Sequence, residues 1–295
     1  MNYKILGLGE VLWDLLPTGP ALGGAPANFA WHARTLGATA GVITRVGLDA
    51  WGAEIQKRFA AVAFPPELVQ VDPAAPTGTV SVRMSSAGVP DYTIHEGVAW
   101  DFLAATPAAR AAVGAADAVG FGSLAQRTPA ARAAVQTLLA ATSPAALRVF
   151  DLNLRQHYYD RDTLLASLER ANVLKLNEAE LPILVELLGL PGETRAALSA
   201  LAAAFPLRLL ALTRGPAGSL LWRAGEWSDH PGAPVRVVDT VGAGDAFTAA
   251  LVLGELQGRS LAELNSLANT VARAVCAQAG ATPPLPAELV RQFAG

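Results

Sequence analysis

The chain has 295 residues, of which 52% are hydrophobic and 16% charged, so it can bury a sizeable core and is not expected to be disordered. Its net charge of −3, without a long basic run, argues against nucleic acid as the main partner. The single cysteine, Cys276, excludes an internal disulfide and a cysteine-based zinc site. No uninterrupted apolar run has membrane-spanning length and the N-terminus lacks a signal-peptide pattern, so we expect a cytoplasmic protein with no membrane partner.

Short apolar runs typical of strands alternate with helical patterns along the chain. Predicted strands lie at residues 5–9, 41–46, 118–121, 148–152, 173–176 and 208–213. Predicted helices lie between them, at residues 27–36, 51–63, 129–141, 161–171, 178–188 and 194–205. This alternation indicates an α/β fold with a mostly parallel sheet covered by helices. The strands are almost wholly apolar, as expected when both faces of a sheet are covered.

One stretch departs from this alternation. Residues 79–84 alternate polar and apolar side chains, residues 91–95 partly do so, and residues 85–90 have the composition of a hairpin loop. Such alternation indicates a sheet with one covered face, so we predict a small hairpin that acts as a lid. An edge hairpin of the main sheet is the alternative. Leu12, Leu15 and Leu16, followed by turn residues, predict a second pair of lid strands. The lid segments, at about 10–22 and 78–100, would then be inserted in a single domain covering residues 1–295.

Residues 239–247, DTVGAGDAF, are the most informative stretch. Two glycines flank one small residue, a carboxylate follows, and an apolar run continues as a predicted buried helix. The N–H groups of Gly242, Ala243 and Gly244 would lie unpaired at the helix N-terminus, which is a ready anion site. Asp245 beside them could accept a proton from a hydroxyl. A glycine-rich helix start capped by Asp245 is the alternative interpretation.

DTVGAGDAF resembles the C-terminal signature of the PfkB (ribokinase-like) carbohydrate kinases. The resemblance implies that Asp245 is the catalytic base and that Gly242, Ala243 and Gly244 form the anion hole. It also implies a ribokinase-like three-layer sandwich with a small β lid. The activity implied is transfer of the γ-phosphoryl group of ATP, with Mg²⁺, to a hydroxyl of a sugar.

A second group of candidate residues lies near the N-terminus. Asp14 is followed by Gly23-Gly24 and by Asn28 in the first turn of a predicted helix. A carboxylate and an amide from separate loops suit a polyhydroxyl ligand, although a turn aspartate and a helix cap are the alternative. Both motifs resemble the sugar-binding region of the family, where the Asp, the Gly-Gly pair and the Asn contact the sugar. The sequences of these motifs, LWDLLP and LGGAPANFAWHA, are most similar to those of bacterial fructokinases.

A third group follows the strand predicted at residues 148–152. Asp151, Asn153 and Arg155 would share one face at a period of two, at the strand end where open α/β sheets bind ligands. The guanidinium of Arg155 is a fixed donor fork for hydroxyls or phosphate oxygens, and a salt bridge between Arg155 and Asp151 is the alternative. The stretch resembles the D-x-N-x-R motif of the family, which lies near the substrate and the phosphates.

Asn177 and Glu180 match the N-x-x-E motif that the family associates with Mg²⁺ and phosphate positioning. The same spacing is also a capping box. We assign no direct protein ligand to Mg²⁺, which would arrive with ATP and meet Glu180 through water. Lys175 would contact a nucleotide phosphate, or else be an ordinary exposed lysine at a strand end.

The nucleotide side is predicted from two weaker signals. Thr213, Gly215 and Gly218 match the T-x-G-x-x-G loop of the family, and a plain turn between strands is the alternative. Asn269 lies on a predicted helix, where family members often line the adenine pocket. Some relatives also bind K⁺ beside the loop at residues 239–242.

We therefore predict an ATP-dependent sugar kinase that phosphorylates a primary hydroxyl, with fructose as the first substrate and fructose 6-phosphate as its product. Kinases for 2-keto-3-deoxygluconate, ribose or a nucleoside are the alternatives, as is a non-catalytic sugar-binding regulator. A Rossmann fingerprint fails because its third glycine would fall at Leu12, and no Gly-Lys pair exists for a P-loop. The apolar lid face (Val80, Val82, Met84) would pack over the sugar or against the lid of a second subunit in a homodimer.

Overall fold

The computed structural model describes residues 3–84 and 90–294, so most of the predicted hairpin loop at 85–90 lies outside the described residues. In these ranges nine strands form one sheet in the order β13-β12-β11-β10-β9-β8-β1-β4-β5, and only β12 and β13 run antiparallel to their neighbours. These strands are β1 (Lys4–Leu8), β4 (Thr39–Gly47), β5 (Val69–Asp72), β8 (Ala118–Phe121), β9 (Leu147–Asp151), β10 (Val173–Asn177), β11 (Leu209–Thr213), β12 (Ser219–Arg223) and β13 (Glu226–His230).

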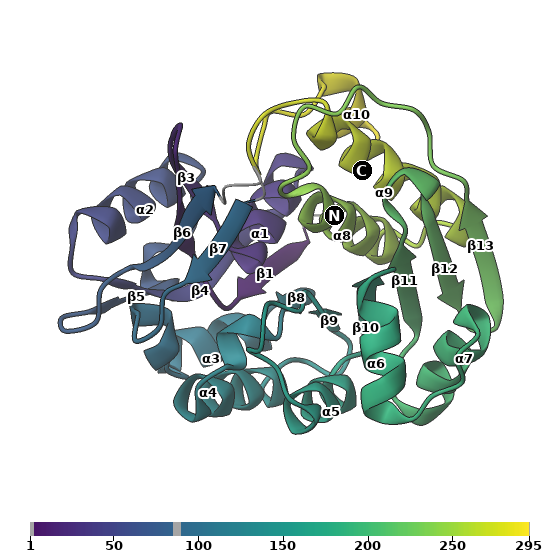
Figure 1. The fold of residues 1–295 in the computed structure, drawn as a ribbon, viewed down its shortest axis with the longest axis horizontal. Helices are drawn as coiled ribbons and strands as arrows, with labels where there is room; N and C mark the ends of the chain where they lie inside the picture. Colours follow the sequence, from purple (N-terminus) through teal and green to yellow (C-terminus); the bar gives the residue numbers. More distant parts are fainter. Residues whose placement is uncertain (1–2, 85–89, 295) are drawn as a thin grey trace.

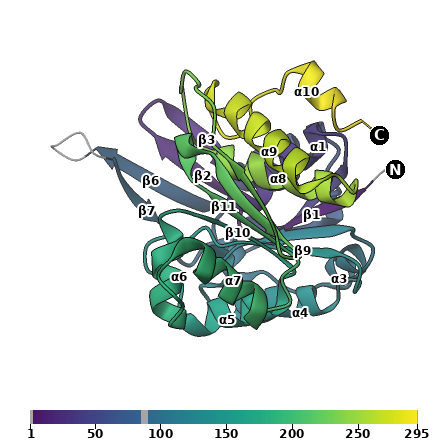
Figure 2. The ribbon, with the colours of Figure 1, turned by 90° about the vertical axis from the view of Figure 1, so that its right-hand side faces the viewer.

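Helices cover both faces of this sheet, which confirms the predicted α/β sandwich of three layers (Figure 2). One layer contains α1 (Ala25–Thr35), α2 (Ala50–Ala61), α8 (Ala243–Leu256), α9 (Leu261–Cys276) and α10 (Ala287–Arg291). The other contains α3 (Pro107–Gly114), α4 (Pro129–Ala140), α5 (Arg161–Arg170), α6 (Glu180–Leu188) and α7 (Thr194–Ala204). Of the helices in residues 3–84 and 90–294, none combines the length and the apolar character that crossing a bilayer requires.

Local sequence signals decide where several helices begin. Residues 106–113 and 128–135 are the same octapeptide, TPAARAAV, and they begin α3 and α4 in the same way. In each copy the threonine hydroxyl accepts a hydrogen bond from the N–H three residues later, and proline occupies the first helical position. All six predicted strands and six predicted helices are present, with their ends displaced by up to a few residues.

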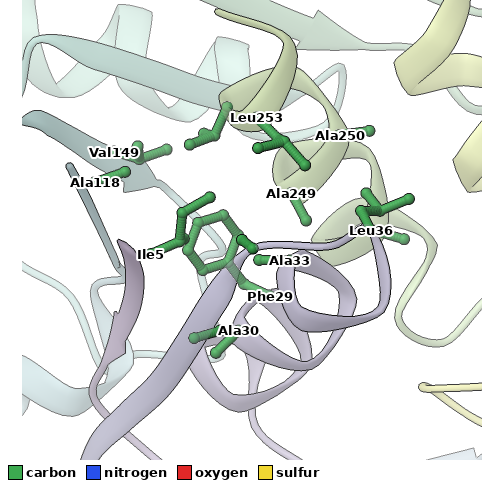
Figure 3. Close-up of a cluster of buried hydrophobic side chains, with 14 of the residues drawn as sticks. Ile5, Phe29, Ala30, Ala33, Leu36, Ala118, Val149, Ala249, Ala250 and Leu253 are labelled. Atoms are coloured by element: carbon green, nitrogen blue, oxygen red, sulfur yellow. The ribbon is translucent and has the colours of Figure 1, made fainter. Parts of the chain in front are cut away.

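The core between the sheet and α1 and α8 brings the two halves of the chain together (Figure 3). Ile5 of β1 and Phe29 of α1 pack with Leu253 of α8, and all three are almost fully buried. A side chain at Gly120 would lie 2.6 Å from the Phe29 ring, so this glycine makes room for the phenylalanine. Because α1 and α8 are packed in this way, their N-terminal ends are held close to each other.

A second sheet lies apart from the main one (Figure 1). Its strand order is β3-β2-β6-β7, with β2 (Leu12–Leu16), β3 (Gly19–Gly23), β6 (Gly78–Met84) and β7 (Pro90–Ile94). The two hairpins meet through a parallel pairing of β2 with β6. Both predicted pairs of strands are therefore confirmed, and the alternative of an edge hairpin on the main sheet is wrong. We call this second sheet the small sheet.

Candidate active site

A continuous cavity of about 2020 Å³ extends from the small sheet across the carboxyl ends of the main strands to the start of α8 and to α9. The predicted site residues that line it are Asp14, Gly23, Gly24, Asn28, Asn153, Arg155, Lys175, Asn177, Thr213, Gly215, Gly218, Gly242, Ala243, Gly244, Asp245 and Asn269. Glu180 is the one predicted site residue that does not line the cavity. Residues from six separate stretches of the chain thus meet in one place, as ligand sites of α/β sheets do.

The start of α8 forms an anion site in the middle of the cavity. Gly242 has a φ of 78°, and a side chain there would lie 2.1 Å from the carbonyl oxygen of Ala281, so only glycine fits. The N–H groups of Gly242 and Gly244 meet no acceptor among the described residues. The N–H of Ala243 donates a long hydrogen bond of 3.3 Å to the carbonyl oxygen of Thr240. The expectation of three unpaired N–H groups is therefore wrong for Ala243, and two free donors point at the cavity end of the helix.

Asp245 lies directly beside these N–H groups. Its Oδ2 accepts a hydrogen bond of 2.8 Å from the side-chain amide of Asn28, so the packing of α1 against α8 fixes the carboxylate. Burial, and then the charge of Asp151, raise the pKa of Asp245 to about 6, while Asn28, Lys175 and Arg155 oppose this rise. A carboxylate with such a pKa is ionised at neutral pH and can accept a proton.

Lys175 brings a positive charge to the same place. Its Nζ lies 3.0 Å from Asp151 Oδ1, and the hydroxyl of Thr248 donates to the other oxygen of that carboxylate. A side chain at Gly244 would lie 3.1 Å from Nζ, so the ammonium group lies against the anion site. Burial lowers the pKa of Lys175, but the surrounding carboxylates, Asp151 first, outweigh burial and raise it. Lys175 is 6% exposed, so the interpretation as an ordinary exposed lysine is wrong.

The loop after β9 departs from the predicted alternation. The strand ends at Asp151, and Asn153 has a φ of 42°, in the left-handed region that few residues other than glycine adopt. The period of two is therefore broken, and the expectation of one shared face is wrong. Asp151 pairs with Lys175, which also excludes the alternative salt bridge to Arg155. Asn153 and Arg155 line the cavity instead.

Glu180 lies behind the cavity wall and ties two segments together. Its Oε2 accepts the N–H of Asn177 at 2.8 Å, and Asn177 Oδ1 accepts the N–H of Glu180 at 3.0 Å, the reciprocal pair of a capping box. The other oxygen, Oε1, accepts the N–H of Leu154 at 2.9 Å. Glu180 therefore connects the loop at 153–155 to the start of α6, and burial followed by the charge of Asp151 raises its pKa.

The Gly-Gly pair before α1 shapes the end of the cavity under the small sheet, which we call the sugar end because the family resemblance predicts that the sugar binds there. A side chain at Gly23 would lie 2.6 Å from Asp14 Oδ2, and one at Gly24 would lie 2.6 Å from the carbonyl oxygen of Glu10. Gly24, whose φ is 110°, is thus required by its close approach to backbone, whereas the contact at Gly23 is with a side chain. Burial raises the pKa of Asp14 to about 6, and the charge of Arg155 opposes this.

Glu10 is a cavity residue to which the sequence analysis gave no role. It directly follows Gly9 at the carboxyl end of β1, is 2% exposed, and lines the sugar end. Burial raises its pKa to about 7, while its own backbone N–H and the charge of Arg155 oppose the rise. Its position after β1 is the signal that could have identified it. The strands that follow β1 in the sequence are placed on both sides of it in the sheet, and open α/β sheets bind ligands at the carboxyl end of such a strand.

The other end of the cavity, which we call the nucleotide end because the family resemblance predicts that ATP binds there, is lined largely by loops. A side chain at Gly218 would lie 2.0 Å from the carbonyl oxygen of His230, so the loops after β11 and β13 touch through backbone. Residues 215–217 form a short 3₁₀ turn between two strands, as the plain-turn alternative describes, and they also border the cavity. The amide nitrogen of Asn269 donates to Ser219 Oγ at 2.7 Å and to Asn265 Oδ1 at 3.0 Å, so it is already engaged within the protein.

The sequence matches the family model described as "pfkB family carbohydrate kinase" over residues 19–288. The chain belongs to this family. The fructokinase of Klebsiella pneumoniae is 33% identical over 265 residues, which cover 86% of this chain and 85% of that protein. The fructokinase of Escherichia coli is 31% identical over 268 residues, with the same coverage.

Solved structures agree with this assignment. The structure of the sugar kinase PH1459 from Pyrococcus horikoshii is 26% identical in sequence and has a TM-score of 0.84. The match covers 99% of this chain and 100% of that one. A fructokinase with bound ATP from Xylella fastidiosa, 20% identical, has a TM-score of 0.86 and matches 99% of this chain and 98% of its own. The fold is therefore ribokinase-like, and the protein is a carbohydrate kinase, a phosphotransferase that acts on a sugar hydroxyl.

The geometry of this kinase suits the transfer of a phosphoryl group along the cavity. The free N–H groups at the start of α8 and the ammonium group of Lys175 meet in the middle, where a transferring phosphoryl group needs stabilisation. The carboxylate of Asp245 lies beside these groups, where it can accept a proton. The carboxylates of the sugar end lie to one side and the backbone-lined loops to the other.

Proposed function

We propose that this carbohydrate kinase transfers the γ-phosphoryl group of ATP to the 6-hydroxyl of fructose. The observation that favours a neutral sugar over an acidic one is the charge of the sugar end. Among the described side chains, three carboxylates (Glu10, Asp14, Asp245) line it, together with the exposed guanidinium of Arg155. Carboxylates accept hydrogen bonds from neutral hydroxyls, but they repel an acidic substrate such as 2-keto-3-deoxygluconate.

The relatives support the same choice. Both curated proteins named above are fructokinases at 33% and 31% identity, and each alignment covers 86% of this chain. Ribose and nucleosides are also neutral polyols, so the charge of the sugar end does not separate them from fructose. The similarity to fructokinases is what places fructose first.

The proposed reaction uses the groups in the middle of the cavity. Asp245 accepts the proton of the attacking hydroxyl, the hydroxyl oxygen forms a bond to the γ-phosphorus, and the bond from that phosphorus to the bridging oxygen breaks to release ADP. The N–H groups of Gly242 and Gly244 and the ammonium group of Lys175 stabilise the charge on the transferring group. Phosphoryl transfer needs positioning and electrostatics above all, and these groups supply both.

Mg²⁺ carried by the phosphates of ATP would neutralise part of their charge. Asn177 lines the cavity and would lie on the metal side. Both Glu180 oxygens already accept backbone N–H groups behind the wall, and each keeps a second lone pair, which fits contact with Mg²⁺ through water.

K⁺ is proposed beside the loop at 239–242, where Asp239 accepts the N–H groups of Val241 and Gly280. Equal activity in potassium and tetramethylammonium chloride would argue against the K⁺ proposal.

The small sheet is proposed as a lid over the sugar, inserted in one kinase domain that acts in the cytoplasm. Val80 is 5% exposed and lines the cavity, so this part of the apolar face is directed at the sugar end. The side chains of Val82 and Met84 lie outside the described part of the structure.

A homodimer through the small sheet stays a proposal, and a monomer at micromolar concentration in light scattering would count against it.

The test is an ADP-release assay with Mg-ATP and a panel of fructose, 2-keto-3-deoxygluconate, ribose, glucose, mannose and adenosine, in the presence of K⁺. We expect fructose to give the highest kcat/KM. A higher value for another member would keep the kinase and replace the proposed substrate. No sugar-dependent turnover with any member would contradict the proposed activity.

A further inference from the structure

Glu10 has a buried oxygen that the protein leaves without a partner. Its Oε2 has no hydrogen-bond partner among the described residues, although Glu10 is 2% exposed and lines the sugar end of the cavity. Buried polar atoms in proteins are nearly always hydrogen-bonded, and leaving one unpaired is costly. Neither proton acceptance by Asp245 nor the anion site uses this oxygen, so it requires an explanation of its own.

The backbone holds Glu10 firmly in this position. Gly9 before it has a φ of 146° and donates its N–H to the carbonyl oxygen of Ile43 at 3.0 Å. A side chain at Gly24 would lie 2.6 Å from the carbonyl oxygen of Glu10. The end of β1 and the start of α1 are therefore pressed together around this residue. A side chain that only filled space here could be apolar, as most of the surrounding core is.

The charges that act on Glu10 belong to cavity residues. Arg155 lowers its pKa and Asp245 raises it, and both line the sugar end. The carboxyl group thus lies within electrostatic reach of the proposed base. A hydroxyl can pair with Glu10 in either protonation state, because it donates to a carboxylate and accepts from a carboxylic acid.

We propose that Oε2 of Glu10 binds a hydroxyl of the sugar other than the one that Asp245 deprotonates. Glu10 is then a specificity-determining residue for neutral polyols, and this inference rests on the proposed kinase function. A sugar without that hydroxyl leaves the buried oxygen unpaired in the complex. Sites built around such a bond reject the analogue that lacks it far more strongly than apolar pockets reject a size change.

The experiment measures kcat/KM for the preferred sugar of the panel and for each monodeoxy derivative that keeps the hydroxyl to be phosphorylated. For the wild-type enzyme, kcat/KM should be lower by roughly a hundredfold or more with the derivative that lacks the hydroxyl bound by Glu10. Glu10→Met, which keeps the length but removes the hydrogen bond, should lose most of that discrimination at that hydroxyl alone. Glu10→Gln should restore part of it, because an amide still bonds a hydroxyl. Asp14→Asn is the matched control, and its effect should fall on a different hydroxyl.

A purely structural role for Glu10 predicts other results. It would lower kcat/KM of the Met variant for all sugars by the same factor, and this outcome would overturn the inference while the kinase function stands. Should Glu10→Met fail to fold, Glu10→Gln decides: an equal loss of kcat/KM for the parent sugar and for every deoxy derivative in this variant would overturn the inference. Absence of sugar-dependent turnover in the wild type would instead overturn the proposed function and the inference together.

Discussion

At the sugar end of the cavity the wall includes three carboxylates among apolar side chains, whereas at the nucleotide end the loops after β11 and β13 meet through closely packed backbone. Glu10, Asp14 and Asp245 have raised pKa values because they are buried, and Asn28 fixes the last of them. At the other end Gly218 contacts His230 through backbone. Side chains that bond hydroxyls can select one sugar among many, while backbone sets the shape of a slot for a common phosphoryl donor.

The strongest test of this contrast is Asp245→Asn. The amide keeps the size of the side chain but cannot accept the proton, so we expect kcat to fall by roughly a hundredfold or more. We propose that the nucleotide binds at the other end, so its binding should persist. Steady-state ADP release gives kcat, and calorimetry gives the Kd of ATP. Near-normal turnover would remove Asp245 from its role as the base.

Two glycines test the nucleotide end. A side chain at Gly218 would lie 2.0 Å from a backbone oxygen, whereas one at Gly225, which also has positive φ, would meet no atom within 4 Å. Gly218→Ala should therefore raise the KM for ATP by roughly tenfold or more through backbone displacement, with the sugar KM little changed. Gly225→Ala is the control for backbone strain alone. Equal effects of the two substitutions on the KM for ATP would contradict the proposed slot.

The pH dependence tests the sugar end. Asp245, with a pKa of about 6, must be ionised to act, so kcat/KM for the sugar should fall about tenfold from pH 7 to pH 5. Asp14, Glu10 and Asp245 bind protons more tightly in the folded than in the unfolded chain. Their ionisation therefore costs stability above about pH 6 to 7, and this cost disappears as the pH falls. Circular dichroism at pH 5 should show folded protein, and a flat profile of kcat/KM would contradict the account.

Asn28→Ala should have the smallest effect. The hydrogen bond from Asn28 lowers the pKa of Asp245, so its removal should raise that pKa and move the fall in activity to higher pH. We expect little loss of kcat at pH 8 and a several-fold loss at pH 6. Comparison of the two pH–rate profiles provides the measurement. A uniform loss at all pH values would mean that Asn28 does not act through Asp245.

The sequence predicts most of the sheet because strands covered on both faces are apolar runs. Of the main sheet it missed β5, β12 and β13, which lie at an edge or next to one. β12, with the sequence SLLWR, has only three consecutive apolar residues. β13, with the sequence EWSDH, is mostly polar, and β5 has four residues, so neither gives a clear run. The short helix α3 was also missed, although it has the same octapeptide as the predicted α4.

The site was predicted wherever its residues belong to a spaced motif, and missed where tertiary contacts decide. Asn177 and Glu180 follow a fixed spacing, but only the fold shows that Glu180 lies behind the wall. The left-handed conformation of Asn153 breaks the alternation of residues 151, 153 and 155 that the sequence alone suggests. Glu10 acquires its unpaired oxygen only because α1 packs against the end of β1.

The most direct measurement of the central claim is a phosphorus NMR spectrum of the products from Mg-ATP and fructose. We predict ADP together with a sugar phosphate whose phosphorus couples to the protons of carbon 6, and with Asp245→Asn the same product at a rate lower by roughly a hundredfold or more. Inorganic phosphate alone, or unchanged ATP with fructose while another sugar of the panel is phosphorylated, would contradict the account.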